Sequence, residues 1–128
     1  MANRFLIGTF PLGRETVDLF GVTSLAGGQL VLNPDSGRAF IEVGLINEEW
    51  DFTVSILLHE TMEFLMMRSF VAYRNIGQLY ASPSSRLFVL SHEQLDDICD
   101  KQAVFVVAAL PKLAAAWKKN QKKKRTKE

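Results

Sequence analysis

The residues most able to do chemistry lie in the segment SILLHETMEFLMMRSF, residues 55–70. His59 and Glu63 are four positions apart, so a helix places both side chains on one face. An imidazole and a carboxylate at this spacing can bind one zinc ion from a single helix. Glu60 follows His59 about 100° around the helix. That position suits a general base that acts on a metal-bound water.

A zinc hydrolase needs a third protein ligand and one open coordination position. The usual motif is H-E-x-x-H, but this chain has Glu63 where the second histidine would stand. His92 is the only other histidine, and it directly follows Ser91 at the expected start of another helix. If the fold brings His92 to His59 and Glu63, two imidazoles and one carboxylate complete a ligand set known from zinc peptidases.

Each of these residues also has an ordinary structural explanation. H-E-x-x-E is a weak motif because glutamate is common in helices, and a single histidine near a helix start is often a hydrogen-bonded surface residue. Glu60 and Glu63 can pair with surface arginines such as Arg68. However, the segment is apolar on most sides, which predicts a central helix. Burying an imidazole and two carboxylates without partners is costly, and a metal ion would satisfy them.

The first third of the chain is predicted to form strands. Two β-prone runs cover residues 4–10 and 16–22. The runs 29–32 and 39–45 flank the sequence NPDSG, which has proline, aspartate and glycine where a tight turn needs them. We therefore expect a hairpin there and a small antiparallel sheet overall.

The rest of the chain is predicted to be helical. Asn47 can cap a first helix, which nothing interrupts before about Arg74. Residues 75–85, rich in serine, are expected to form a connecting loop. Ser91 and Gln94 match a capping box at the start of a second long helix.

The order of strands, helix, loop and helix indicates an α+β fold in one domain over residues 1–117. Its small antiparallel sheet is expected to pack on the two long helices. Pro111 lies inside the second helix and predicts a kink or a restart. Cys99, the only cysteine, is expected to be a buried, unreactive thiol. Because a single cysteine cannot form an intrachain disulfide, we expect a cytoplasmic protein.

Basic residues are concentrated at the C-terminus. Residues 118–128 hold seven basic and one acidic side chain, for a net charge of +6, whereas residues 1–117 carry −5. We expect 118–128 to be a frayed helix end or a disordered tail. The basic side chains between Lys118 and Lys127 can contact nucleic acid or an acidic protein, or can simply aid solubility. No apolar run approaches the ~20 residues of a membrane span, so no membrane partner is expected.

Together, these features resemble a known family. The β-prone run 39–45, a Leu-Leu-His-Glu-x-x-Glu helix, and a serine-capped His-Glu-Gln-Leu that begins the second helix are similar to small phage and prophage zincin-like proteins related to minigluzincin metallopeptidases. The resemblance covers residues 38–113. It implies a zincin-like fold, with His59, Glu63 and His92 as zinc ligands and Glu60 as the general base.

The function implied by the resemblance is zinc-assisted hydrolysis of a peptide or protein substrate, in the cytoplasm of a bacterium or a phage-infected host cell. The chain departs from the family at Glu63, where a histidine is expected, and in an aromatic, serine-rich insertion at 73–85. The alternative is a catalytically inactive phage or prophage interaction protein, which binds protein or nucleic acid through its basic C-terminal segment. The sequence leaves the oligomeric state open.

Overall fold

The computed structural model describes residues 3–32, 38–69, 72–74, 86–88 and 90–127. Four strands form the main sheet: β1 (Arg4–Leu12), β2 (Glu15–Val22), β3 (Gly28–Leu32) and β4 (Ala39–Gly44). The other elements are helix α1 (Trp50–Arg68), a small hairpin of β5 (Ala72–Arg74) and β6 (Arg86–Phe88), and helix α2 (His92–Lys127). The predicted α+β class, with strands first and two long helices after them, is confirmed.

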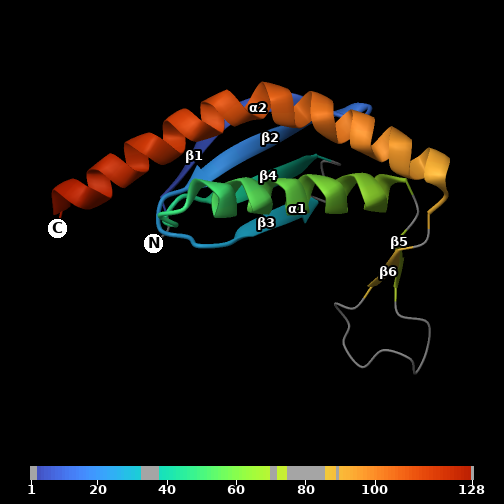
Figure 1. Cartoon of the computed structure of the whole chain (residues 1–128), viewed down its shortest axis with the longest axis horizontal. Helices are drawn as coiled ribbons and strands as arrows, with labels where there is room; N and C mark the ends of the chain where they lie inside the picture. Colours follow the sequence, from blue (N-terminus) through green and yellow to red (C-terminus); the bar gives the residue numbers. More distant parts are fainter. Residues whose placement is uncertain (1–2, 33–37, 70–71, 75–85, 89, 128) are drawn as a thin grey trace.

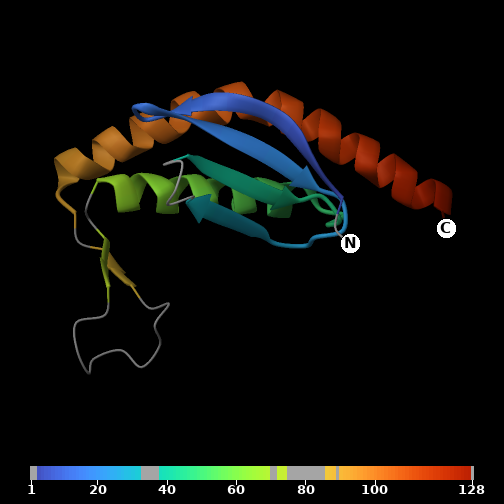
Figure 2. The same cartoon turned by 180° about the vertical axis from the view of Figure 1, so that it is seen from behind.

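Both helices lie on the same face of the sheet, as Figure 1 shows from the helix side and Figure 2 from the sheet side. α1 packs against β3 and β4, while α2 packs against β1 and β2, and the two helices contact each other. Alternate positions of the strands point into this layer because successive strand residues face opposite sides. The fully buried core side chains include Leu12, Val17, Leu19, Ile41, Val43, Leu45, Leu57, Ile98, Phe105 and Leu113.

The sheet is mixed, so the expectation of a wholly antiparallel sheet is wrong. Its strand order is β1-β2-β4-β3. β1 pairs with β2 and β3 with β4 in antiparallel fashion, which confirms the predicted hairpin, but β2 and β4 are parallel. The cause is the route of the chain. After β2 the chain crosses the end of β4 and forms β3 at the edge of the sheet. It then turns back and forms β4 between β2 and β3, so β4 runs parallel to β2.

Gly44 allows the connection at residues 23–27 to pass the end of β4. A Cβ atom at this position would overlap the carbonyl oxygen of Leu25. The Gly44 amide donates to the Gly27 carbonyl at 2.7 Å, and the Ile46 amide donates to the Leu25 carbonyl at 3.3 Å. Backbone hydrogen bonds therefore hold the connection against β4 at a distance that only glycine permits.

α1 is shorter than predicted, ending at Arg68 rather than near Arg74. Its N-cap residue is Glu49, which makes no side-chain cap hydrogen bond. Asn47, the predicted cap, instead donates its side-chain amide to the connection between β2 and β3. The loop predicted at 75–85 lies outside the described residues.

α2 begins with the predicted capping box, which is confirmed. The Ser91 amide donates to Oε1 of Gln94 at 2.8 Å, and the Gln94 amide donates to Oγ of Ser91 at 3.1 Å. The helix passes through Pro111 without restarting, and it bows over the sheet (Figures 1 and 2). After Trp117, where a frayed end or a disordered tail was expected, the helix continues to Lys127.

Candidate functional site

His59 and Glu63 lie together on the solvent-facing side of α1. Nε2 of His59 is 3.4 Å from Oε2 of Glu63, and the two side chains are 69% and 31% exposed. The pair borders an open groove of about 560 Å³ between α1 and α2. The groove is lined by Ser55, Leu58, His59, Met62, Glu63, Met66 and Gln102. An imidazole–carboxylate pair thus stands beside a largely apolar surface.

Gln102 sets the register of α2 against α1. Its side-chain amide donates to the carbonyl of Leu58 and to Oγ1 of Thr61, both at 2.9 Å. Thr61 is fully buried, so these bonds satisfy polar groups inside the helix pair. Each helical residue advances about 1.5 Å along the axis. His92 therefore lies about 15 Å from Gln102, toward the N-terminal end of α2.

His92 has a different partner from the one the sequence suggested. Its Nδ1 is 3.3 Å from Oδ2 of Asp96 in the next turn of α2, and its side chain is 85% exposed. The structure therefore brings His59 together with Glu63 and leaves His92 apart from them. Among the described residues, no group of three or more His, Cys, Asp or Glu side chains is placed to hold a metal ion. The zinc ligand set stays a prediction.

Glu60 points toward the sheet rather than into the groove. The residue is only 8% exposed, and a Cβ atom on Gly28 of β3 would lie 3.5 Å from the Glu60 Cγ. Burial raises the pKa of the Glu60 carboxyl; the negative charge of Glu63 adds to the rise, and His59 opposes it. A raised pKa is typical of carboxyls that exchange protons. The general-base role of Glu60 stays a prediction as well.

Cys99 is exposed on α2, although a buried thiol was expected. Adjacent helix positions differ by about 100° in direction. Ile98 takes the core-facing position in this turn and is fully buried. Cys99 is consequently turned toward solvent.

A second candidate site lies at the C-terminal end of α2, which is attached to the body of the protein. Gln121 is only 8% exposed, and its side-chain amide donates to the carbonyls of Leu45 at 2.9 Å and Asn47 at 2.8 Å. Nζ of Lys124 donates to the carbonyl of Ile46 at 3.4 Å. These bonds hold the last turns of α2 against the loop between β4 and α1.

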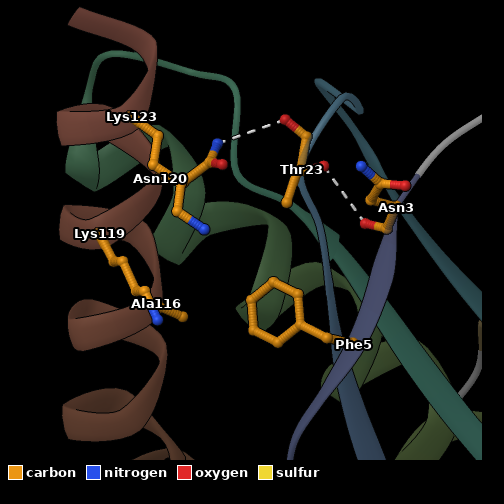
Figure 3. A pocket seen from close by; sticks show the side chains of 7 residues that line it. All are labelled: Asn3, Phe5, Thr23, Ala116, Lys119, Asn120 and Lys123. Atoms are coloured by element: carbon orange, nitrogen blue, oxygen red, sulfur yellow. Dashed lines mark hydrogen bonds between the residues drawn. The ribbon is translucent and has the colours of Figure 1, made fainter. Parts of the chain in front are cut away.

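A pocket of about 300 Å³ lies where this part of α2 meets the sheet, and its lining side chains are drawn in Figure 3. Lys119 and Lys123 border it from the helix, and the ring of Phe5, a residue that is 41% exposed, borders it from β1. The Asn120 side-chain amide donates to the Thr23 carbonyl at 3.3 Å and closes one side. An adjoining hollow of about 390 Å³ also includes Asn3, Ser24, Ile46 and Lys124.

This pocket combines cations, amides and one aromatic ring. Sequence reasoning identified the basic segment that contains Lys119 and Lys123, but it missed Phe5. No local pattern links Phe5 to lysines near the opposite end of the chain, because only the packing of α2 beside β1 brings them together.

Within the described part of the chain, no helix is both long and apolar enough to cross a membrane. No protein-family model, curated protein or solved structure matches the chain. Its function is therefore inferred from its own residues.

Proposed function

We propose that the protein is an interaction protein that binds single-stranded nucleic acid in the pocket between β1 and the C-terminal end of α2. The observation that carries this proposal is the joint lining of one pocket by Lys119, Lys123 and the exposed ring of Phe5. Proteins that bind single strands combine cations along the phosphate backbone with aromatic rings on which bases stack.

The surroundings of the pocket support the same partner. Asn3 adds an amide group that can donate to phosphate and sugar oxygens. The hydrogen bonds of Gln121 fix the helix that carries the lysines, so less conformational freedom is lost on binding. The charge contrast between residues 118–128 and the acidic body also directs an anionic partner to this end of the molecule.

We expect a charge reversal at Lys123 to weaken binding to a fluorescein-labelled oligo(dT) strand, measured by fluorescence anisotropy at several salt concentrations. Lys123→Glu should lower affinity about 10-fold at low salt and reduce the slope of log K against log salt concentration. Phe5→Ala should lower affinity by a similar factor with little change of slope, because stacking contributes about 1–3 kcal/mol per base.

Arg14→Glu is the matched control. Arg14 is exposed in the turn between β1 and β2, at the other end of these strands, and the substitution makes the same change in net charge. Its effect should be small. Equal losses from Lys123→Glu and Arg14→Glu would show that net charge alone matters. Binding to poly-glutamate but not to oligo(dT) would assign the site to an acidic protein and overturn the proposal.

A second candidate function, zinc binding in a zincin-like fold, is favoured by the proximity of His59 and Glu63. As the resemblance implies, His92 would be the third ligand and Glu60 the base in peptide hydrolysis. The 3.4 Å separation and the open groove beside the pair support this candidate. The fit is incomplete, because His92 is placed away from the pair and a zinc enzyme needs three protein ligands.

On this second candidate, native mass spectrometry of protein prepared with excess zinc should show one zinc ion per chain. His59→Ala and His92→Ala should each abolish it without changing the circular dichroism spectrum. Cys99→Ser is the control, because it removes an exposed donor outside the proposed set. Zinc that survives His92→Ala would exclude His92 as a ligand, and zinc-free wild-type protein would remove the candidate altogether.

A further inference from the structure

α2 carries an exposed surface along the side that faces away from the sheet. Its positions recur every three or four residues, which places them on one face of a helix. The core-facing side of α2 is different, with Ile98, Phe105 and Leu113 all fully buried. We call the outward-facing surface the α2 stripe.

The chemistry of the α2 stripe changes in order along the helix. Its first part is acidic, with Glu93, Asp97 and Asp100 exposed. Its centre is apolar, with Val104, Val107, Ala108, Pro111 and Ala115 exposed. Its last part is basic, with Lys118, Lys122 and Arg125 exposed. Val104 and Val107 are 59% and 73% exposed, which is unusual for two aliphatic side chains on one face.

The α2 stripe is complementary to itself when it is reversed. Two α2 helices can be placed antiparallel so that they cross at the level of the exposed Val107 and Pro111. The facing pairs are then Glu93 with Arg125, Asp97 with Lys122, Asp100 with Lys118, Val104 with Ala115 and Val107 with Pro111. Every acidic position meets a basic one, and the apolar centre meets itself. A two-fold axis at this point repeats each pair.

We propose that a second copy of this chain docks antiparallel on the α2 stripe to form a two-fold symmetric dimer. A parallel arrangement would place acid against acid and base against base, which is unfavourable. A partner whose surface does not run from basic through apolar to acidic would be complementary to only part of the α2 stripe. The occupant that the surface itself specifies is therefore another α2.

The shape of α2 assigns different roles to the parts of the stripe. The helix bows away from the sheet at its middle, so its apolar centre is the most prominent part (Figure 1). Val104 and Val107 would make the close contact, and the small side chains of Ala108 and Ala115 let the helices approach. The helix ends turn back toward the sheet, so the charged ends of two such helices diverge and attract across water (Figure 1). They select the antiparallel orientation in a salt-dependent manner.

This proposal is independent of nucleic-acid binding. Lys119 and Lys123 border the pocket in Figure 3, whereas Lys118 and Lys122 belong to the α2 stripe. Adjacent helix positions point about 100° apart. A dimer through the stripe would leave both pockets open.

Sedimentation velocity of the full chain, without nucleic acid, tests the proposal. We expect a monomer–dimer equilibrium that weakens as salt rises from about 0.05 to about 0.5 M. Asp100→Lys and Lys118→Asp should each raise the dimer dissociation constant at least ~10-fold. Each substitution places like charges opposite one another, and the two-fold axis repeats this unfavourable pair. The double variant should restore dimerisation, because the pairs re-form with reversed sign.

Val107→Asp tests the apolar centre, and it should give a monomer with an unchanged circular dichroism spectrum because the position is exposed. Arg14→Asp, away from the stripe, should leave the dimer intact. A wild-type chain that remains monomeric at about 100 μM in low salt would overturn the proposal. So would a dimer that is insensitive to Val107→Asp, or a double variant that stays as weak as the single ones.

Discussion

Phe105→Ala is expected to lower the free energy of unfolding by about 3–5 kcal/mol, because it leaves a cavity in the core. Phe105 is fully buried on α2, and its ring meets the ring of Phe10 on β1 edge to face at 5.5 Å. This contact helps to join α2 to the sheet, so its loss also loosens the helix that carries the pocket lysines. Urea denaturation followed by circular dichroism measures the change.

Phe52→Ala is the matched control, because Phe52 is 49% exposed near the start of α1. Phe52→Ala removes the same side chain from a half-exposed position. The expected loss in the free energy of unfolding is therefore below about 1 kcal/mol. Similar losses in the two variants would contradict the placement of Phe105 in the core.

Gly44→Ala is expected to destabilise the fold by about 2–3 kcal/mol through overpacking. The added methyl group would overlap the carbonyl oxygen of Leu25 and approach that of Gly27 within 2.7 Å. Both are backbone atoms, so relief requires the connection between β2 and β3 to move away. That movement breaks the hydrogen bond from the Gly44 amide to Gly27. Amide hydrogen exchange should show faster exchange in β3 and β4 before global unfolding.

Gly27→Ala provides the comparison within the same connection. A Cβ atom on Gly27 would have no neighbour within 4 Å among the described residues. We expect little change in the free energy of unfolding. If Gly27→Ala were as damaging as Gly44→Ala, the cause would be lost glycine flexibility in the connection and not its close approach to β4.

Features of the fold that depend on neighbouring residues were predictable from the sequence. The turn residues NPDSG indicated the hairpin that β3 and β4 form. The spacing of Ser91 and Gln94 indicated the cap of α2. The parallel pairing of β2 with β4 was not predictable in this way, because it joins Asp18 to Phe40 and depends on the crossing at Gly44.

The same distinction holds for the candidate sites. The spacing of His59 and Glu63 indicated a shared helix face, and they do lie together. The place of His92 depends on the register that Gln102 sets between two helices, and no local pattern encodes that register. The lysines near the C-terminus were visible as a run of charge. Their packing against Phe5 was not, because it is a property of the assembled fold.

The hydrogen bonds from Gln121 to Leu45 and Asn47 have a consequence for biosynthesis. They join positions 76 and 74 residues apart in the chain, and α2 as a whole covers β1 and β2, which precede it in the sequence. A nascent chain leaves the ribosome with its N-terminus first. The inner faces of β1 and β2 therefore emerge long before the helix that buries them. The fold can therefore be completed only after α2 has left the ribosome, and until then the inner face of the sheet stays uncovered.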